Sequence, residues 1–490
     1  MVRALSSSCS GKAARASSRS PQRSRIRACI LHQRDFTNVE TPRRLPFVPS
    51  DLDLSVILPA HNEGRNLQVL LPQLRSVLQK LGIETEVLVV VRGLDTQTQA
   101  SVQGGLAAII EQREPGYGGA LRAGFSRARG RYILTMDADL SHPPTFISDL
   151  WRRRHEAEIL IASRYVHGGS AKMPLFRALL SRILNRFFAR GLGVPLDDLS
   201  SGFRLYRRSA LRMHAVRARN FDVLPEIVVR AYAEGLQIQE IPFRYEPRAH
   251  GSSNARIIPF GLAYLRTFRS LWSLRNTVAS ADYDDRAFDS VVPLQRYWQR
   301  QRHRHITHFL DAEERTLDVG CGSSRIIAAL PRGSVGVDIH FPKLRYARRF
   351  GRQLVQATGL KLPFFDAAFG CVVASQVLEY FACEAPGLAE ISRVLAPGGR
   401  LILGSPDYGR WRWRLAGSLY SRVVPGARET RHLARYTRGE LVDKCTAHGF
   451  ELEAERNILG AEVILVFRKP PESHLPEGCE PPGGDVGKVT

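Results

Sequence analysis

Short apolar runs alternate with amphipathic stretches twice along this 490-residue chain, and this alternation constrains its fold more than any other feature. The first series begins at LSVILPA (54–60) and continues through EVLVVV, YILTMD and EILIAS. The second begins at RTLDVGCG (315–322) and closes with RLILGSP and AEVILVFRK. Short apolar runs separated by helical stretches are typical of α/β domains with a largely parallel sheet. The sequence therefore predicts two α/β domains.

Changes in composition divide the chain further. We expect a first domain over 51–279, a linker over 280–294 that contains the polar stretch SADYDDRAFDS, and a second domain over 295–468. Residues 1–50 are rich in Ser and Arg, which is typical of a disordered basic tail or an organellar targeting segment. Residues 469–490 are rich in Pro and Gly and predict a second disordered tail.

The apolar runs and the cysteines limit where the protein can act. No run of about 18 uncharged apolar residues offers a membrane span. The seven cysteines are scattered, without a CxxC pair or a His/Cys cluster, so we expect a reducing compartment and no structural zinc. These features favour a cytoplasmic protein, free or peripheral at a membrane, with organellar targeting by residues 1–45 left open. The oligomeric state is also left open.

The formal charge of +23 raises the question of a nucleic-acid partner. The excess of basic residues is 8 in residues 1–50, 11 in 51–280 and 4 in 281–490, so it lies in the tail and the first domain. Of the 70 basic residues 62 are arginine, which a GC-rich genome explains as well as a binding surface does. No recognition motif accompanies the charge, so nucleic acid is disfavoured as a partner.

Two aspartates one residue apart follow an apolar run in ILTMDADLSH (133–142). In an extended strand residues i and i+2 point the same way, so Asp137 and Asp139 can face one ligand. Because two adjacent carboxylates repel, a cation is expected between them. Mg²⁺ and Mn²⁺ prefer oxygen ligands and often take one or two carboxylates with substrate phosphate. The stretch predicts a metal-bound diphosphate; solvated acids at a strand end are the alternative.

Three further motifs accompany these aspartates: PAHNE (59–63), the glycine loop PGYGGALRAG (115–124) and DDLSSGFRLYRR (197–208). In this order, over about residues 54–275, they resemble the dolichyl- and polyprenyl-phosphate sugar transferases, which are inverting family 2 glycosyltransferases with a Rossmann-like nucleotide-sugar fold. The resemblance implies metal-dependent sugar transfer from a nucleotide sugar to a polyprenyl-phosphate-like acceptor.

The resemblance also assigns roles to residues of this chain. It implies a nucleotide pocket at Pro59, His61, Asn62 and Glu63, and a metal site at Asp137 and Asp139. It also implies phosphate-binding arginines at Arg164, Arg204 and Arg248, and an acceptor-phosphate pair at Arg177 and Ser181. Asp198 is implied as an orienting group or weak base. His61 stands where the family usually has Tyr. Because an acceptor phosphate is already anionic, the reaction needs positioning and charge compensation more than a strong base.

One stretch departs from the family pattern. Where the family usually has two acids after its second strand, this chain has Val91 and Arg92 in VVVRGLDTQT, and Asp95 lies too far along to replace them without a shifted loop. The donor therefore stays open, and so does an inactive or unusual transferase.

Two stretches, 175–193 and 257–275, are apolar with interspersed arginines. Both suit helices that lie in an anionic membrane surface, where a polyprenyl acceptor is found. Amphipathic helices packed on the core are the alternative.

The second series opens with a glycine turn, LDVGCGSSR (317–325). Gly320 and Gly322 allow close approach of the backbone to a ligand, and Asp338 follows 20 residues after Asp318, a spacing that suits an acid on ribose hydroxyls. Two later stretches, LKLPFFDAAFGCVVASQVLEYF and EISRVLAPGGRLILGSP, make the succession over about 295–468 resemble class I S-adenosylmethionine-dependent methyltransferases.

This second resemblance implies S-adenosylmethionine as cofactor. Asp318, Gly320 and Gly322 would hold its methionine end and Asp338 its ribose. Glu379 is either a substrate-side acid or a solvated acid at a helix start. Thr358 stands where the family has an acid near the adenine, and FGC replaces the frequent Phe-Asp pair, so a decayed domain is the alternative.

The two resemblances together predict a bifunctional transferase that acts in successive steps on one glycoconjugate or lipid-linked sugar. A polyprenyl-phosphate glycosyltransferase with a second domain that only binds cofactor is the first alternative. A basic nucleic-acid-binding scaffold with degenerate enzyme domains is the second.

Overall fold

The computed structural model describes residues 52–93, 96–102, 105–211, 216–247, 257–381, 383–415, 418 and 432–471, apart from the side chains of 177 and 257–260. Most of the two predicted tails, Asp95 and Arg248 therefore lie outside the described residues.

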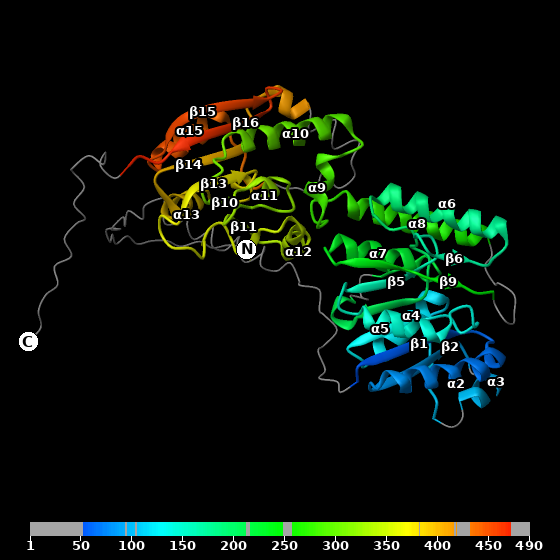
Figure 1. Ribbon diagram of the computed structural model, residues 1–490. Helices are drawn as coiled ribbons and strands as arrows, with labels where there is room; N and C mark the ends of the chain where they lie inside the picture. The colour runs from blue at the N-terminus through cyan, green and yellow to red at the C-terminus, as the bar shows by residue number, and fades with distance from the viewer. Residues whose placement is uncertain are drawn as a thin grey trace, which may run out of the picture. The chain divides into compact units, whose positions relative to one another are not determined.

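The first domain is built on a seven-stranded sheet with the order β3-β2-β1-β4-β7-β5-β8 (Figure 1). Its strands are β1 (Leu54–Ala60), β2 (Thr85–Val91), β3 (Ala108–Glu111), β4 (Tyr132–Thr135), β5 (Ile159–Ser163), β7 (Arg204–Arg207) and β8 (Ile238–Pro242). Strand β7 runs antiparallel to its neighbours β4 and β5, and the other pairs are parallel. A separate ladder joins β6 (Ser170–Ala171) to β9 (Arg244–Tyr245).

Successive residues of β1 point to opposite faces of this sheet, and each face has its own core. Ile57 packs in one core with residues of α4 (Tyr117–Arg127), α6 (Leu175–Leu192), α7 (Val223–Ala233) and α8 (Ile257–Arg275). Val56 and Leu58 pack in the other core with α2 (Gly64–Leu81) and α5 (Ile147–Arg152). Helix α3 (Thr96–Val102) packs beside α2. Near-continuous burial of β1 on both faces explains its unbroken apolar sequence.

The second domain also has a seven-stranded sheet, with the order β12-β11-β10-β13-β14-β16-β15. Its strands are β10 (Thr316–Val319), β11 (Val335–Asp338), β12 (Gln353–Gln356), β13 (Phe369–Ser375), β14 (Leu395–Pro406), β15 (Glu451–Ile458) and β16 (Glu462–Arg468). Strand β16 is antiparallel to β14 and β15, while the other pairs are parallel.

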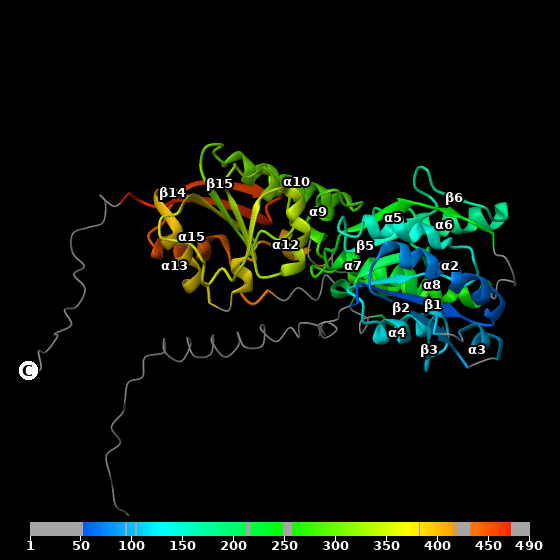
Figure 2. The ribbon, with the colours of Figure 1, turned by 60° about the horizontal axis from the view of Figure 1, so that its bottom comes forward.

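Helices cover both faces of this second sheet as well. Helices α10 (Pro293–His308), α11 (Ile326–Ala329) and α12 (Phe341–Ala347) share one apolar core. Helices α13 (Ala385–Val394) and α15 (Arg438–Ala447) share the other. Figure 2 shows α10 and the pair α13 and α15 on opposite sides of the strands. The stretch expected as a linker contains a helix, α9 (Tyr283–Phe288), which packs on α10.

Both sheets confirm the predicted α/β fold class, and each has a point where the strand order reverses. In the first sheet this point lies between β1 and β4, and in the second between β10 and β13. Open α/β sheets bind ligands in the crevice outside the carboxyl ends of such strands. The stretches after β1, β4, β10 and β13 are therefore where ligands are expected, and they contain the predicted acidic and glycine motifs.

Two further features complete the fold. In the described part of the chain no helix is both long enough and apolar enough to cross a bilayer. The cysteines that the structure describes are free: Cys321, Cys371 and Cys445 are buried, and Cys383 is partly exposed.

Candidate active sites

The predicted metal aspartates lie in a turn beyond β4, which ends at Thr135. Asp139 is buried, and its Oδ1 accepts hydrogen bonds from the Ser141 amide at 3.1 Å and the Ser141 hydroxyl at 2.5 Å. Asp137 is partly exposed, and its Oδ1 accepts from the Tyr117 hydroxyl at 3.1 Å. The strand alternation expected for this pair is wrong, because the turn rather than an extended strand holds each carboxylate.

His142 fixes this turn and was missed from the sequence. Its Nδ1 accepts a hydrogen bond from the Asp137 amide at 2.9 Å, and its ring stacks on Phe203 at 4.9 Å between centroids. Burial lowers the pKa of His142 and outweighs the opposing charges of Asp137 and Asp139, so the ring is neutral at neutral pH. His142 Nε2 also lies 3.9 Å from Asp137 Oδ2, so the ring stands directly beside this carboxylate. A histidine three residues after an aspartate is too common a pattern to reveal this role.

The two aspartates fit a metal held jointly with a ligand. In the described residues no group of three or more His, Cys, Asp or Glu side chains is arranged to hold a metal by itself. Mg²⁺ commonly takes only one or two carboxylates and fills its shell with water and substrate phosphates. The donor set at Asp137 and Asp139 therefore suits an ion that arrives with a diphosphate.

The predicted nucleotide residues lie at the carboxyl end of β1. Pro59 is in the strand, while His61 and Asn62 are exposed directly after it. Asn62 has a φ of 58°, a left-handed conformation that asparagine tolerates better than most residues. Glu63 precedes α2 and accepts a hydrogen bond from the Asn66 side chain. The structure thus brings this motif to the same reversal point as the aspartates.

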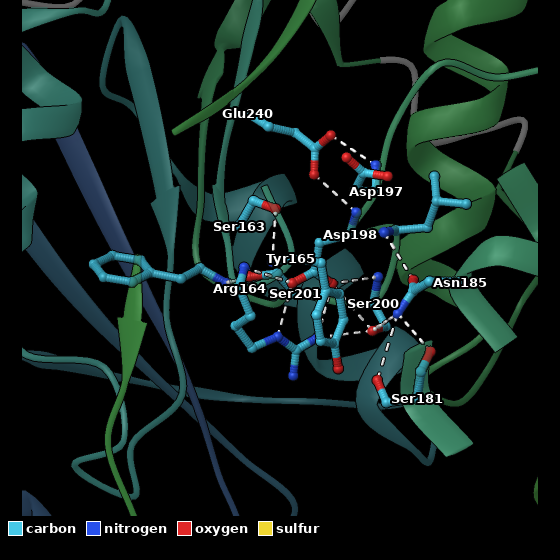
Figure 3. A network of polar contacts seen from close by, with 12 residues as sticks. Ser163, Arg164, Tyr165, Ser181, Asn185, Asp197, Asp198, Ser200, Ser201 and Glu240 are labelled. Atoms are coloured by element: carbon cyan, nitrogen blue, oxygen red, sulfur yellow. Dashed lines mark hydrogen bonds and ion pairs between the residues drawn. The ribbon is translucent and has the colours of Figure 1, made fainter. Parts of the chain in front are cut away.

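Arg164 and Asp198, predicted as separate functional groups, form a two-pronged ion pair (Figure 3). The Nε and Nη2 atoms of Arg164 each donate to one Asp198 oxygen at 2.7 Å, and Nη2 also donates to the Ser200 hydroxyl at 2.8 Å. Burial acts to raise the pKa of Asp198, but the charge and hydrogen bonds of Arg164 bring it below the ordinary value. Asp198 is therefore an ionised partner of the arginine, which favours an orienting role over a base.

Helix α6 is tied to this ion pair through Asn185 (Figure 3). The Asn185 side-chain amide donates to the Ser200 hydroxyl at 2.9 Å and to the Ser181 carbonyl at 2.9 Å, and its oxygen accepts from the Leu199 amide at 2.9 Å. The Ser181 hydroxyl lies 3.4 Å from the same Asn185 nitrogen. Ser181 thus faces the network, while the side chain of Arg177 lies outside the described residues.

Glu240 on β8 holds the loop that carries Asp197 and Asp198, a role that was not predicted from the sequence. Its carboxylate accepts from the amides of Asp197 at 2.7 Å and Asp198 at 2.8 Å. Burial raises the pKa of Glu240 despite these hydrogen bonds. A strand glutamate in the polar stretch QIQE gives no sequence signal for this contact.

The structure does not bring Arg204 to a ligand-facing position. Its side chain is fully buried and donates to the carbonyls of Leu224 at 2.8 Å and Leu199 at 2.6 Å. The expectation of a phosphate contact at Arg204 is therefore corrected to a core position under the loop that carries Asp198. Arg248 lies outside the described residues. At the end of β2, Val91 is buried and Arg92 is exposed.

In the second domain the glycine turn follows β10. Gly320 and Gly322 have φ values of 70° and 52°, where side chains are strained. A Cβ at Gly320 would lie 2.3 Å from Val377 Cγ2, so this glycine is required by packing inside the protein. Asp338 at the end of β11 closes the turn, because its two oxygens accept from the amides of Gly322 at 2.8 Å and His340 at 2.6 Å.

Asp318 lies under this turn with an unsatisfied oxygen. The residue is buried, and its Oδ2 has no hydrogen-bond partner among the described residues. Burial and the nearby Asp338 charge raise the pKa of Asp318 well above its ordinary value. A buried carboxylate without a partner beneath a glycine turn suits the cationic methionine end of S-adenosylmethionine, which would relieve both effects.

Asp284 on α9 joins the same turn, although the sequence placed it in a linker. Its Oδ2 accepts from the Ser323 amide at 3.1 Å and from Lys343 Nζ at 2.8 Å. Burial acts to raise the pKa of Asp284, but Lys343 and Ser323 bring it below its ordinary value. The acidic run in YDDR was the only sequence signal for this contact, and it also fits an exposed linker.

Glu379 follows β13 in the 3-10 helix η5 (Leu378–Tyr380) and is fully buried. The Ser405 hydroxyl donates to its Oε1, and its Oε2 has no partner in the described part of the chain. Burial raises the pKa of Glu379 to about 7. The alternative of a solvated acid at a helix start is therefore wrong. Thr358, the departure near the expected adenine site, accepts from the Leu360 amide at 3.3 Å.

Comparisons with known proteins divide the chain in the same way. Residues 55–214 match the model of glycosyl transferase family 2, and residues 317–403 match a methyltransferase domain model. A dolichol-phosphate mannosyltransferase from Pyrococcus furiosus is 30% identical over 216 residues, which is 42% of this chain and 60% of that protein. An undecaprenyl-phosphate 4-deoxy-4-formamido-L-arabinose transferase from Pseudomonas paraeruginosa is 31% identical over 214 residues, 42% of this chain and 61% of its own length. The chain thus spans about 60% of the length of these curated relatives.

Solved structures also align with parts of the chain. A SAM-dependent methyltransferase from Thermotoga maritima is 21% identical, with a TM-score of 0.30, and covers 38% of this chain and 99% of its own. Glucosyl-3-phosphoglycerate synthase from Mycobacterium tuberculosis, solved with Mn²⁺ and uridine diphosphate, is 16% identical, with a TM-score of 0.36, and covers 46% of this chain and 80% of its own. The family models and the curated relatives lead to one conclusion: the chain contains a family 2 glycosyltransferase domain and a methyltransferase domain.

Proposed function

We propose that the protein is a bifunctional transferase. The first domain transfers a sugar from a nucleotide sugar to a polyprenyl-phosphate-like acceptor, and the second methylates a related substrate with S-adenosylmethionine. The observation that carries the first activity is the meeting of the PAHNE motif and the aspartate turn at the reversal point of the first sheet, beside loops tied by the Arg164–Asp198 ion pair. The relatives named above act on dolichol phosphate and undecaprenyl phosphate, which supports this acceptor class.

In this proposal Asp137 and Asp139 hold a Mg²⁺ or Mn²⁺ ion against the donor diphosphate, where the ion supplies Lewis-acid stabilisation of the leaving group. His142 and Ser141 keep the two carboxylates oriented. Asp198 and Ser200 fix the guanidinium of Arg164 so that its remaining Nη1 edge is directed to a phosphate. An acceptor phosphate needs no base, so the residues mainly align it and compensate charge.

The acceptor side also includes a membrane contact. Six large apolar side chains of α6 are exposed: Leu175, Phe176, Leu179, Leu180, Ile183 and Phe187. Leu262 and Leu265 of α8 are exposed as well, and α8 packs on α6. Arg182, Arg186 and Arg190 are spaced four residues apart on the same helix. An exposed apolar surface with arginines suits an anionic bilayer surface that holds a polyprenyl chain.

In the second domain the residues around the glycine turn prepare the cofactor site. S-adenosylmethionine, when bound, supplies an electrophilic methyl group. Asp318 balances the positive methionine end, and Asp338 holds the turn and accepts from ribose hydroxyls. Asp284 and Lys343 lie at the turn as an ion pair, so their opposite charges balance each other. Methyl transfer is an in-line displacement, so alignment and exclusion of water are the main tasks of these residues.

The replacement Asp139→Asn tests the proposal on the first domain. The amide oxygen can still accept from Ser141, so the turn is retained while one negative charge toward the metal is lost. Sugar transfer from UDP- and GDP-sugars to a short polyprenyl phosphate should be abolished or should need far more Mg²⁺, whereas S-adenosylmethionine affinity should not change. Asp149→Asn, at a half-exposed side chain on α5, serves as the control. Undiminished transfer by Asp139→Asn with unchanged dependence on Mg²⁺ would contradict the metal assignment.

A further inference from the structure

A cluster of aromatic and basic side chains lies at the carboxyl ends of β13 and β14, beside the glycine turn. Tyr380 follows β13, Tyr408 follows β14, and His432 comes from the segment that leads to α15. The Tyr408 hydroxyl lies 2.5 Å from His432 Nδ1, and the rings of Tyr380 and His432 have centroids 5.1 Å apart. None of these three residues has a role in the function proposed above.

Main-chain hydrogen bonds hold His432 in place from both strand ends. The amides of Leu433 and Ala434 donate to the Glu379 carbonyl at 2.8 and 3.0 Å, and the Tyr408 amide donates to the Tyr436 carbonyl at 3.0 Å. The position of the imidazole is therefore set by residues that follow β13 and β14, and β13 borders the reversal point of the sheet. Such support from regular elements is what a precisely placed functional group needs.

The cluster faces the cofactor side and is accessible. The Tyr380 amide donates to the Val377 carbonyl at 3.0 Å, and Val377 lies directly against Gly320, so Tyr380 stands beside the glycine turn. Burial raises the pKa of Tyr380 to about 12. Tyr380 is nevertheless 43% exposed. An acceptor that enters over Tyr380 would thus lie between His432 and the turn that holds the methyl donor.

We propose that His432, oriented by Tyr408, is the general base that removes the proton of a hydroxyl group on a ring-shaped, sugar-like methyl acceptor. This inference rests on the proposed methyltransferase function. A base is needed only for an acceptor that carries a proton at neutral pH, which excludes a carboxylate. The aromatic faces of Tyr380 and His432 suit a ring, and the glycosyltransferase domain makes a sugar hydroxyl the fitting class.

In this step the acceptor oxygen uses a lone pair to bond the methyl carbon. The bond between that carbon and sulfur breaks, its electron pair stays on sulfur, and the hydroxyl proton passes to Nε2 of His432. Nε2 can accept only when the ring proton lies on Nδ1, donated to Tyr408. Tyr408 can serve as that acceptor because a phenolic oxygen accepts as well as donates, and its hydroxyl lies within hydrogen-bond distance of Nδ1.

The charge state agrees with this role. Burial lowers the pKa of His432, and the positive charge of Arg435 lowers it further, so the imidazole is neutral at neutral pH. In the part of the chain that the structure describes, the rings of Tyr380 and Tyr408 also lie against the imidazole. Burial raises the pKa of both tyrosines, so they are neutral and cannot hold His432 in the protonated form.

The first test uses the full-length protein and tritium-labelled S-adenosylmethionine, with methyl glycosides and phenol as hydroxyl probes and benzoate as a probe without a proton. His432→Ala should lower methylation of the hydroxyl probes by about a hundredfold or more and leave cofactor affinity unchanged. Added imidazole should restore part of the rate, which a structural role would not allow. His448→Ala, on a partly exposed histidine at the end of α15, is the matched control.

A second measurement needs no acceptor. Nitrogen-labelled histidine, assigned by comparison with His432→Ala, should show His432 as the neutral tautomer with its proton on Nδ1. A proton on Nε2 would overturn the proposal, and so would full hydroxyl methylation by His432→Ala, or a loss that imidazole does not restore. A parent that does not bind S-adenosylmethionine would instead retire the methyltransferase function. If the parent binds the cofactor but methylates none of the probes, the tautomer measurement decides: a proton on Nδ1 supports the proposal, and a proton on Nε2 overturns it.

Discussion

Three carboxylates of the second domain differ in chemistry because their partners differ; Asp318 and Glu379 are buried, and Asp338 is partly exposed. Asp338 has both oxygens engaged by amides, Asp318 has one oxygen without a partner in the described residues, and Glu379 is held by a single serine hydroxyl. The sequence predicted Asp318 and Asp338, since a glycine turn followed by an acid after the next strand is a local pattern. It could not distinguish a buried Glu379 from a solvated one, because burial there depends on Ser405 and the segment from 432, both distant in sequence.

Replacing Asp338 with Ala should weaken S-adenosylmethionine binding. Ribose hydroxyls would lose their acceptor, at a cost of about 1–3 kcal/mol, or roughly five- to 150-fold in affinity. Calorimetric titration of the full-length protein measures this. Asp366→Ala, an exposed acid, is the control for general effects of charge removal. Equal affinity in Asp338→Ala and the parent would count against the ribose assignment.

Replacing Glu379 with Gln should change how stability depends on pH. The folded pKa of about 7 lies above the ordinary 4.5, so protonated Glu379 favours the folded state below about pH 4.5, and this contribution is lost as pH rises through about 7. The loss is up to about 3 kcal/mol, at about 1.4 kcal/mol per pKa unit. Calorimetric unfolding at about pH 5 and about pH 8 should show that Gln costs less stability at the higher pH. An equal cost at both values would contradict the buried, protonated acid.

At the scale of elements, sequence pattern predicted strands and glycine turns well and predicted the surroundings of side chains poorly. Asp137 and Asp139 follow a strand as predicted, but β4 ends at Thr135, and His142, which lies beyond the pair, holds the turn that carries them. Arg164 and Asp198 were recognised as separate matches, while their pairing depends on how β5 and the loop before β7 meet. Such contacts arise from tertiary packing, which local patterns do not encode.

The turn after β10 offers a test with an internal control. Gly320 and Gly398 both have positive φ, at 70° and 76°, but a Cβ would lie 2.3 Å from Val377 at Gly320 and would meet nothing within 4 Å at Gly398. Replacing Gly398 with Ala should cost about 1–2 kcal/mol from backbone strain alone. Gly320→Ala should cost clearly more stability. When Gly320→Ala is combined with Val377→Ala, this extra cost should disappear, because the clashing side chain is gone. Chemical denaturation compares them, and equal costs for the two glycines would refute the close approach.

Gly320→Val is therefore a poor probe of cofactor contact, although the motif invites it. The larger side chain would meet Val377 before any ligand is present. Loss of binding in that variant would report a disturbed turn. Asp338→Ala is the cleaner test of the same site.

At the scale of the whole molecule, positive charge and exposed apolar surface coincide on the first domain. Residues 51–280 carry the largest regional excess of basic side chains, and α6 combines three arginines with six exposed large apolar residues. Composition alone could not separate a membrane surface from a nucleic-acid surface, since both attract arginine. The exposed leucines and phenylalanines favour the membrane, because a bilayer can remove these apolar side chains from water and a nucleic acid cannot.

We therefore predict that Leu179→Asp weakens binding to vesicles with anionic lipid by about tenfold or more, since burial of a leucine contributes about 1.5–3 kcal/mol. Vesicle sedimentation of the full-length protein measures this. Val69→Asp on α2, another exposed aliphatic position in the first domain, should bind like the parent. Equal loss in both variants would indicate a general charge effect, and no loss in either would contradict the assigned surface.

The distribution of cysteines makes the two halves separately observable in the intact chain. Between Cys29 and Cys321 the sequence contains none, so the first domain has no thiol, while Cys321, Cys371 and Cys445 are buried in the second. Burial raises the pKa of each of these thiols, so they react with alkylating agents only when the surrounding structure opens. The alkylation rate at these three positions therefore measures how often the methyltransferase domain alone opens. A lower alkylation rate after addition of a nucleotide sugar would show that a ligand of the first domain stabilises the second domain against opening.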